Sequence, residues 1–228
     1  RFYIWVIRGT PLLVQLFISG MNSALTPWMY SKIKKGDIRS MRKVLQLLSI
    51  VVVGIAVALM LISPEMVLIF GSPKYREAVY VIPPVAASVF FIFIYNILSM
   101  PQFYYEKTQF LMAASMAAAG ANVVLNFIFI RLFGYIAAGY TTLACYMLYS
   151  VGHYIVSKQI LVNEGIQENL MNPGFLLACS VFLIGASIIC NLIFPYRILR
   201  YAILLASAGL VFWKKELLLK TMADIRKK

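Results

Sequence analysis

The stretch VLQLLSIVVVGIAVALMLISP, residues 44 to 64, contains no charged side chain. As an α-helix it would extend about 31 Å, enough to cross the hydrocarbon core of a bilayer, which is about 30 Å thick. The sequence therefore predicts an all-α polytopic membrane protein, folded as a helical bundle. Similar apolar runs predict seven membrane spans: Thr10–Met29, Val44–Ser63, Ala78–Met100, Phe110–Ile130, Gly134–Val156, Gly174–Phe194 and Ile198–Trp213.

The overall composition agrees with a membrane protein. Of the 228 residues, 62% are hydrophobic and 13% are charged, about half the charged fraction of a soluble domain. This excludes a soluble enzyme, a secreted disulfide module and a disordered chain. The net charge of +13 does not indicate nucleic acid, because no RNA-binding aromatic motif or helix-turn-helix spacing occurs. Cys145, Cys179 and Cys190 lie inside apolar runs and are expected to be small core residues.

The positive charges indicate how the spans are oriented, since cytoplasmic loops collect Lys and Arg. If the loop after the first span is cytoplasmic, fourteen positive residues lie inside and seven outside. This predicts a cytoplasmic C-terminus. The segment Tyr30–Lys43, with a break at Gly36-Asp37, is either a topology anchor beside anionic lipid or a linker helix that also contacts an anionic headgroup.

Four spans carry polar side chains along one helical face. Such faces line a cavity in a transporter, but they also join membrane helices to one another, and both interpretations stay open. The second and seventh spans carry almost no polar residues, so we expect them to face lipid or to pack peripherally. The four polar stripes are Gln15, Ser19, Asn22 and Thr26; Pro84, Ser88, Tyr95 and Ser99; Thr108, Ser115, Asn122 and Asn126; and Thr142, Tyr146, Tyr149 and His153.

Arg8 and His153 have two interpretations each. Thr10-Pro11 predicts a helix start just after Arg8, whereas a helix that continues through Pro11 would bring Arg8 into the membrane at a kink. The Arg8 guanidinium would then either snorkel to the interface or attract an anion. His153 is either an interfacial residue or a proton relay.

The acidic residues indicate that the chain is not an enzyme. All eight lie in loops or at span ends, and no paired carboxylates, DxD-like metal site, P-loop or nucleophile motif occurs. A membrane glycosyltransferase or hydrolase needs such groups to move protons or hold a metal. We therefore expect no catalysis, no metal and no cofactor.

Several motifs resemble the C-terminal half of bacterial polysaccharide flippases, which are oligosaccharide exporters of the MOP superfamily and relatives of the multidrug MATE transporters. The resemblance covers about residues 20 to 158 and does not extend beyond Asn172. The motifs are Pro27-Trp28-Met29-Tyr30 through Gly36-Asp37; Tyr75-Arg76-Glu77-Ala78 with Ile82-Pro83-Pro84; FYYEKT at Phe103–Thr108; NVVLN at Asn122–Asn126; and GYIAAGYTT at Gly134–Thr142.

The resemblance implies an inner-membrane transporter of two helical lobes related by a pseudo-twofold axis. This chain would be the second lobe, and its start at Arg1 rather than Met fits a piece of a longer protein. Residues 1–43 would form the first helix and a basic linker, 44–158 the core of the lobe, and 159–228 peripheral helices with a basic tail. The implied activity is translocation of an undecaprenyl-diphosphate-linked oligosaccharide, an O-antigen, capsule or exopolysaccharide unit, by alternating access. A polysaccharide polymerase and chain-length machinery would be its partners.

Under this resemblance the candidate site residues fall into two groups. Cations for the diphosphate are Arg8 at the outer end and Lys32, Lys34 and Lys107 at the inner end. Hydrogen-bonding groups for the sugar are Gln15, Asn22, Asn122, Asn126, Tyr146, Tyr149 and His153. The alternatives are another MOP-type exporter of lipid-linked precursors or drugs, a membrane-embedded polymerase or transferase, and a structural membrane subunit.

Overall fold

The computed structural model describes residues 2–70 and 73–213, and within them the side chains of residues 18–69, 77–207 and 209. The described residues form seven α-helices and one 3₁₀ helix, η1, and contain no β-strand. The predicted all-helical fold class is thereby confirmed, and the seven α-helices follow the predicted spans in order. Their bounds are α1 Phe2–Lys34, α2 Ile38–Phe70, η1 Pro73–Tyr80, α3 Ile82–Tyr104, α4 Gln109–Phe133, α5 Ala137–Asn163, α6 Pro173–Ile193 and α7 Arg197–Trp213.

Four segments of the described chain are long and apolar enough to cross a membrane. They are Ile38–Ile69, Glu77–Tyr104, Gln109–Phe133 and Pro173–Ile193, which contain α2, α3, α4 and α6. α5 does not qualify, because its Tyr, Thr, Ser, Gly and His residues lower its mean hydropathy. α7 is too short, with 17 residues. Length and composition thus support membrane crossing for four of the seven predicted spans.

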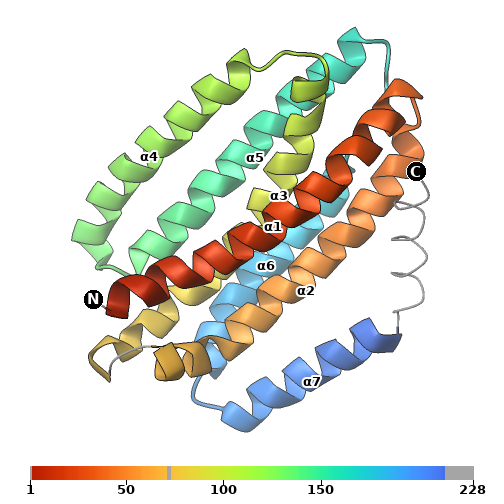
Figure 1. Cartoon of the computed structure of the whole chain (residues 1–228). Helices are drawn as coiled ribbons and strands as arrows, with labels where there is room; N and C mark the ends of the chain where they lie inside the picture. Colours follow the sequence, from red (N-terminus) through yellow and green to blue (C-terminus); the bar gives the residue numbers. More distant parts are fainter. Residues whose placement is uncertain (1, 71–72, 214–228) are drawn as a thin grey trace.

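The chain runs back and forth between two ends of the bundle (Figure 1). One end, which we call the basic end, holds the connections 35–37, 105–108 and 164–172 and the basic residues that flank them. The opposite end holds η1 and the connections 134–136 and 194–196. Successive α-helices therefore alternate in direction, as consecutive membrane spans must.

α1 begins earlier than the sequence predicted. Of the two alternatives at this end, the structure shows the helix that continues through Pro11, and the start at Thr10-Pro11 is wrong, since α1 begins at Phe2. Proline within a helix is tolerated when neighbouring groups satisfy the backbone, as is common in membrane helices. Arg8 and Gln15 thus lie within the helix, in the half of α1 whose side chains are outside the described part of the structure.

α2 also continues through a proline, beyond the predicted end at Ser63. Pro64 cannot donate a hydrogen bond to the Met60 carbonyl. The Ser63 hydroxyl donates to this carbonyl at 2.7 Å, and the Arg200 guanidinium donates to the neighbouring Leu61 carbonyl at 2.7 Å. These side chains satisfy the backbone around the proline, and the helix extends to residue 70.

The core is built around α3, which is in contact with α1, α2, α5 and α6. Its Phe90 and Phe93 side chains are completely buried. α2 packs on α1, α3 and α6 and buries Leu45, Ala56 and Met60. The expectation that α2 packs peripherally is therefore wrong, because a helix without polar residues suits an apolar protein core as well as it suits lipid. The alternative, that α2 faces lipid, is not contradicted, since only 33% of its apolar window is buried.

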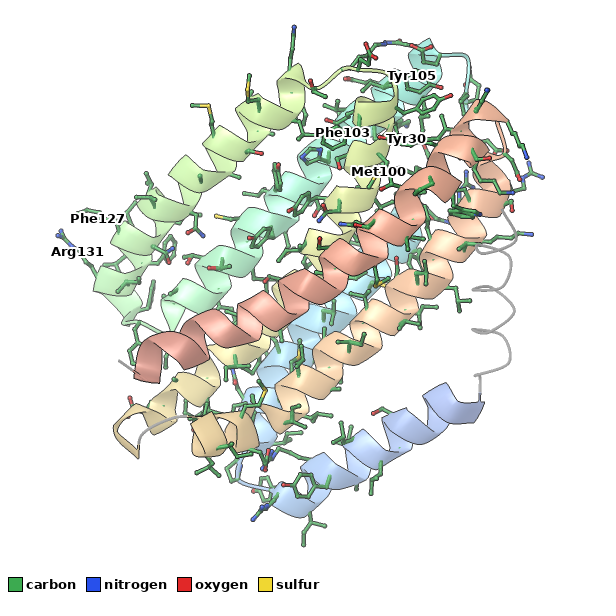
Figure 2. All side chains as sticks on the ribbon, in the orientation of Figure 1. Tyr30, Met100, Phe103, Tyr105, Phe127 and Arg131 are labelled. Carbon is green, nitrogen blue, oxygen red and sulfur yellow. The ribbon has the colours of Figure 1, made fainter. Side chains whose placement is uncertain are left out.

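α4 and α7 are the peripheral helices. They lie at opposite edges of the bundle (Figure 1), α4 packed on α5 and α7 packed on α2 and α6. A peripheral α7 was predicted and is confirmed. No residue in the apolar window of α4 is buried. Phe127 and Arg131 lie on its outward side (Figure 2), with the guanidinium carbon 3.9 Å from the ring centroid.

Candidate functional site

The candidate site lies along the contact between α3 and α5. At the opposite end of the bundle the backbones approach closely at Gly139, where an added Cβ would be 2.8 Å from Pro84 and 2.9 Å from the Val81 carbonyl oxygen. Further along, the Ser150 hydroxyl donates to the Phe91 carbonyl at 2.9 Å, across the two helices. Glycine and serine thus hold α5 against α3 and bring their side chains into register.

Tyr95 of α3 and three residues of α5 form what we call the tyrosine–histidine cluster: Tyr95, Tyr146, Tyr149 and His153. The Tyr95 ring centroid is 6.2 Å from Tyr146 with nearly parallel planes, 4.7 Å from Tyr149 and 5.9 Å from His153. The polar stripes predicted for the third and fifth spans, now α3 and α5, therefore meet. The arrangement places phenol hydroxyls, ring faces and an imidazole along the contact between α3 and α5.

Gln102 of α3 extends the cluster and was missed by sequence reasoning. Its Nε2 lies 2.7 Å from Nδ1 of His153, and both side chains are completely buried. The predicted third span ended at Met100, just before this residue. The signal that could have found Gln102 is its helical spacing from Tyr95 and Ser99, which places all three on one face of α3.

The polar stripe of α4 is used in helix packing. Asn126 Nδ2 donates to Asn122 Oδ1 at 2.9 Å, and Thr141 of α5 donates to Asn126 Oδ1 at 2.6 Å. Ser115 of α4 makes a second bridge, with its hydroxyl 2.7 Å from that of Tyr149. These contacts agree with the interpretation of the stripe as an attachment between helices.

Ser19, Asn22 and Thr26, the part of the α1 stripe whose side chains the structure describes, form no hydrogen bond with the tyrosine–histidine cluster. The Thr26 hydroxyl bonds the Asn22 carbonyl at 2.7 Å and lies 3.5 Å from the sulfur of Met100. Asn22 Oδ1 is buried and has no hydrogen-bond partner among the described residues. Nearer the basic end, the rings of Tyr30 and Tyr104 are 5.3 Å apart, in the region where Figure 2 labels Tyr30 and Met100.

Ion pairs neutralise two of the candidate cations at the basic end. Lys32 pairs with Asp37, and Lys107 pairs with Glu164 at 3.1 Å. Lys34 is exposed and makes no ion pair with any residue that the structure describes. Among the three lysines predicted at this end, Lys34 is therefore the one that could bind an anion without first breaking an ion pair.

The other basic side chains of this end connect the α5–α6 loop to α2. Arg39 pairs with Glu168 at 3.2 Å, and Arg42 donates to the Asn169 carbonyl at 2.7 Å. The pKa of the nearby Tyr105 phenol is raised, first by partial burial and then by the negative charge of Glu164.

A second buried polar group lies at the opposite end and attaches α7 to α2. Arg200, 3% exposed, donates to both carboxylate oxygens of Glu65, at 2.8 and 2.9 Å. The Tyr201 hydroxyl donates to the same carboxylate at 2.9 Å. Since every oxygen of Glu65 is bonded within the protein, this group is an anchor for α7 and not a free binding site.

Comparison with known proteins finds no matching family model, no matching curated protein and no matching solved structure. Among the described residues, no group of three or more His, Cys, Asp or Glu side chains could hold a metal ion. The site is therefore characterised by its own geometry.

Proposed function

We propose that this chain is one lobe of a polysaccharide flippase of the MOP type, which moves an undecaprenyl-diphosphate-linked oligosaccharide from the cytoplasmic to the periplasmic leaflet by alternating access. The observation that carries the proposal is the tyrosine–histidine cluster together with Gln102. Polar side chains also join membrane helices, but attachment alone does not account for Gln102 Oε1 and His153 Nε2, which have no hydrogen-bond partner among the described residues. Buried polar groups inside a membrane bundle cost free energy and are usually retained for function.

The proposed setting is the bacterial inner membrane, with the basic end and the C-terminus facing the cytoplasm. The excess of Lys and Arg at that end supports this orientation. A second, MATE-like lobe outside these 228 residues would face the tyrosine–histidine cluster and complete the cavity. A polysaccharide polymerase and its chain-length machinery would receive the product.

The substrate combines a diphosphate with neutral or acidic sugars, and the chain offers groups for both. Lys34 is available for the diphosphate at the cytoplasmic side, and Lys32 and Lys107 could add charge by exchanging their present partners. The phenol hydroxyl of Tyr146 has no hydrogen-bond partner among the described residues, whereas that of Tyr95 bonds the side chain of Asn96. The Tyr146 hydroxyl is therefore free to bond a sugar hydroxyl, and that of Tyr95 could do so by exchanging its present partner.

The proposal is tested by removing these two hydroxyls while keeping the rings. The whole protein, including any lobe encoded with this chain, is expressed in a strain that lacks its own flippase, and oligosaccharide reaching the periplasmic leaflet is measured. Because each hydroxyl would contribute one hydrogen bond, Tyr95→Phe/Tyr146→Phe should lower transport about tenfold. Tyr154→Phe, on the same helix as Tyr146, is the matched control and should transport normally.

Two results would contradict the proposal. In the first, the unmodified protein moves no lipid-linked oligosaccharide in this strain at normal expression. In the second, the double variant and Tyr154→Phe both transport at the unmodified rate, so the hydroxyls do not contact the substrate. Export of amphipathic cations in place of oligosaccharide would instead indicate the multidrug branch of the superfamily.

A further inference from the structure

Three buried polar side chains between α3 and α5 have hydrogen-bonding atoms without partners. Gln102 and His153 are 0% exposed, and Ser157, one turn further along α5, is 1% exposed. Gln102 Oε1, His153 Nε2 and Ser157 Oγ form no hydrogen bond with any residue that the structure describes. Leaving such atoms buried costs about 1–3 kcal/mol each, so the group requires a functional explanation.

The contact between Gln102 and His153 defines the state of the imidazole. Gln102 Nε2 lies 3.3 Å from the Leu98 carbonyl and 2.7 Å from His153 Nδ1. An amide nitrogen only donates, so its two hydrogens point to these two acceptors. With the amide in this orientation, Nδ1 accepts and is unprotonated, so a neutral ring carries its hydrogen on Nε2. The acceptor oxygen Oε1 of the same amide then has no hydrogen-bond partner among the described residues.

A second arrangement of the same atoms accommodates one more proton. When a proton binds Nδ1, that atom becomes a donor and can no longer accept from Gln102 Nε2. Rotation of the amide by half a turn places Oε1 opposite Nδ1 and restores the hydrogen bond, now to a charged donor and therefore stronger. The hydrogen bond to the Leu98 carbonyl is given up in the exchange.

We propose that His153 is a proton-binding site between α3 and α5, with the Gln102 amide as a two-position acceptor that follows the proton. The groups that face the imidazole are Tyr95 and Gln102 from α3, Phe110 from α4, and Tyr149 from α5. None of these is charged. Beyond the end of α3, the charge of Lys107 is paired with that of Glu164 at the surface.

A proton fits this site better than a metal ion does. The unpartnered acceptor atoms are one amide oxygen and one hydroxyl, and no carboxylate or thiolate is among them to balance a cation. With a proton, the positive charge resides on the protein's own imidazole, and neutral oxygens suffice as acceptors. Proton binding does not depend on transport; only its use as the coupling ion rests on the proposed function.

The experiment uses the fact that His153 is the single histidine of the chain. The purified 228-residue chain is labelled with ¹⁵N in the imidazole and titrated in detergent micelles by NMR, with circular dichroism recorded at every pH. At neutral pH the spectrum should show hydrogen on Nε2 and an unprotonated Nδ1. On acidification both nitrogens should become protonated while the helical signal is unchanged.

Two substitutions at Gln102 should move the titration in opposite directions. Gln102→Leu removes the acceptor and should shift the midpoint about one unit to lower pH, whereas Gln102→Glu supplies a carboxylate and should shift it at least as far to higher pH. Ser187→Ala, a buried serine of α6 that bonds its own helix, is the control and should leave the midpoint unchanged.

The proposal is overturned if the imidazole stays neutral until the helices unfold, if hydrogen lies on Nδ1 at neutral pH, or if the Gln102 variants titrate like the unmodified chain. These readouts do not require transport. A normal titration combined with a transport rate independent of pH would leave the proton site standing and remove its role in the proposed flippase. Failed transport with a normal titration would contradict the proposed function alone.

Discussion

Replacing Gly139 by alanine should separate α3 from α5. The new Cβ would lie 2.8 Å from the Pro84 ring and 2.9 Å from the Val81 carbonyl oxygen, and carbon atoms in proteins do not approach other groups this closely. The proline ring and the backbone carbonyl both belong to rigid parts of the chain. Relief therefore requires the start of α5 to move as a whole, away from the helix that carries Tyr95 and Gln102.

The expected magnitude follows from two opposing effects. Overpacking a well-filled contact costs about 1–3 kcal/mol, and both contacts below 3.0 Å place this site in the upper half of that range. Alanine recovers up to about 1 kcal/mol through its better helix propensity. We expect Gly139→Ala to lower the free energy of unfolding by about 1–2 kcal/mol, which corresponds to about 2–8 °C in Tm.

The assay is thermal unfolding of the purified chain in detergent, followed by circular dichroism. Gly120→Ala is the matched control, because an added Cβ on that residue of α4 meets nothing within 4 Å. The control should unfold at the temperature of the unmodified chain or above it. The reasoning is refuted if Gly139→Ala is as stable as Gly120→Ala.

Two further substitutions test the attachments of the peripheral helices. Glu65→Gln leaves the buried Arg200 without its charge partner and should cost about 3–5 kcal/mol of unfolding free energy, measured by the same thermal assay. The double variant Glu65→Leu/Arg200→Met should recover most of this loss. Equal losses in the single and double variants would contradict the ion-pair account. Asn126→Leu removes the hydrogen bond from Thr141 and should cost about 1 kcal/mol of stability. The loss should appear as faster amide hydrogen exchange in α4, with exchange in α6 unchanged. If α4 exchanges at the same rate in the variant and the unmodified chain, apolar contacts alone hold the helix.

Hydropathy predicted the number and order of the helices, because apolar runs and their interruptions are local properties of the sequence. The ends were less predictable. Proline is a strong stop signal in isolation, yet α2 passes Pro64 because Ser63 and Arg200 satisfy the disturbed carbonyls. Arg200 lies more than 130 positions away in the chain, and no local pattern contains that information.

The candidate site was predictable in part for the same reason. Helical periodicity placed Tyr146, Tyr149 and His153 on one face of α5, and the structure brings them to Tyr95. Periodicity does not specify which face meets which neighbour. It could not show that Asn126 would bond Thr141 or that Lys107 would pair with Glu164. Nor could it show that α2, and not α4, would contribute side chains to the core.

The attachment of α4 to α5 bears on the order of folding. The two helices are adjacent in the chain, joined by three residues, and α4 packs on α5 with little support from elsewhere in the described structure. Closing such a hairpin costs little loop entropy and needs no distant segment to be in place. The same isolation makes α4 the helix that can open without disrupting α2, α3 and α6, so its amides report a separate cooperative unit of lower stability.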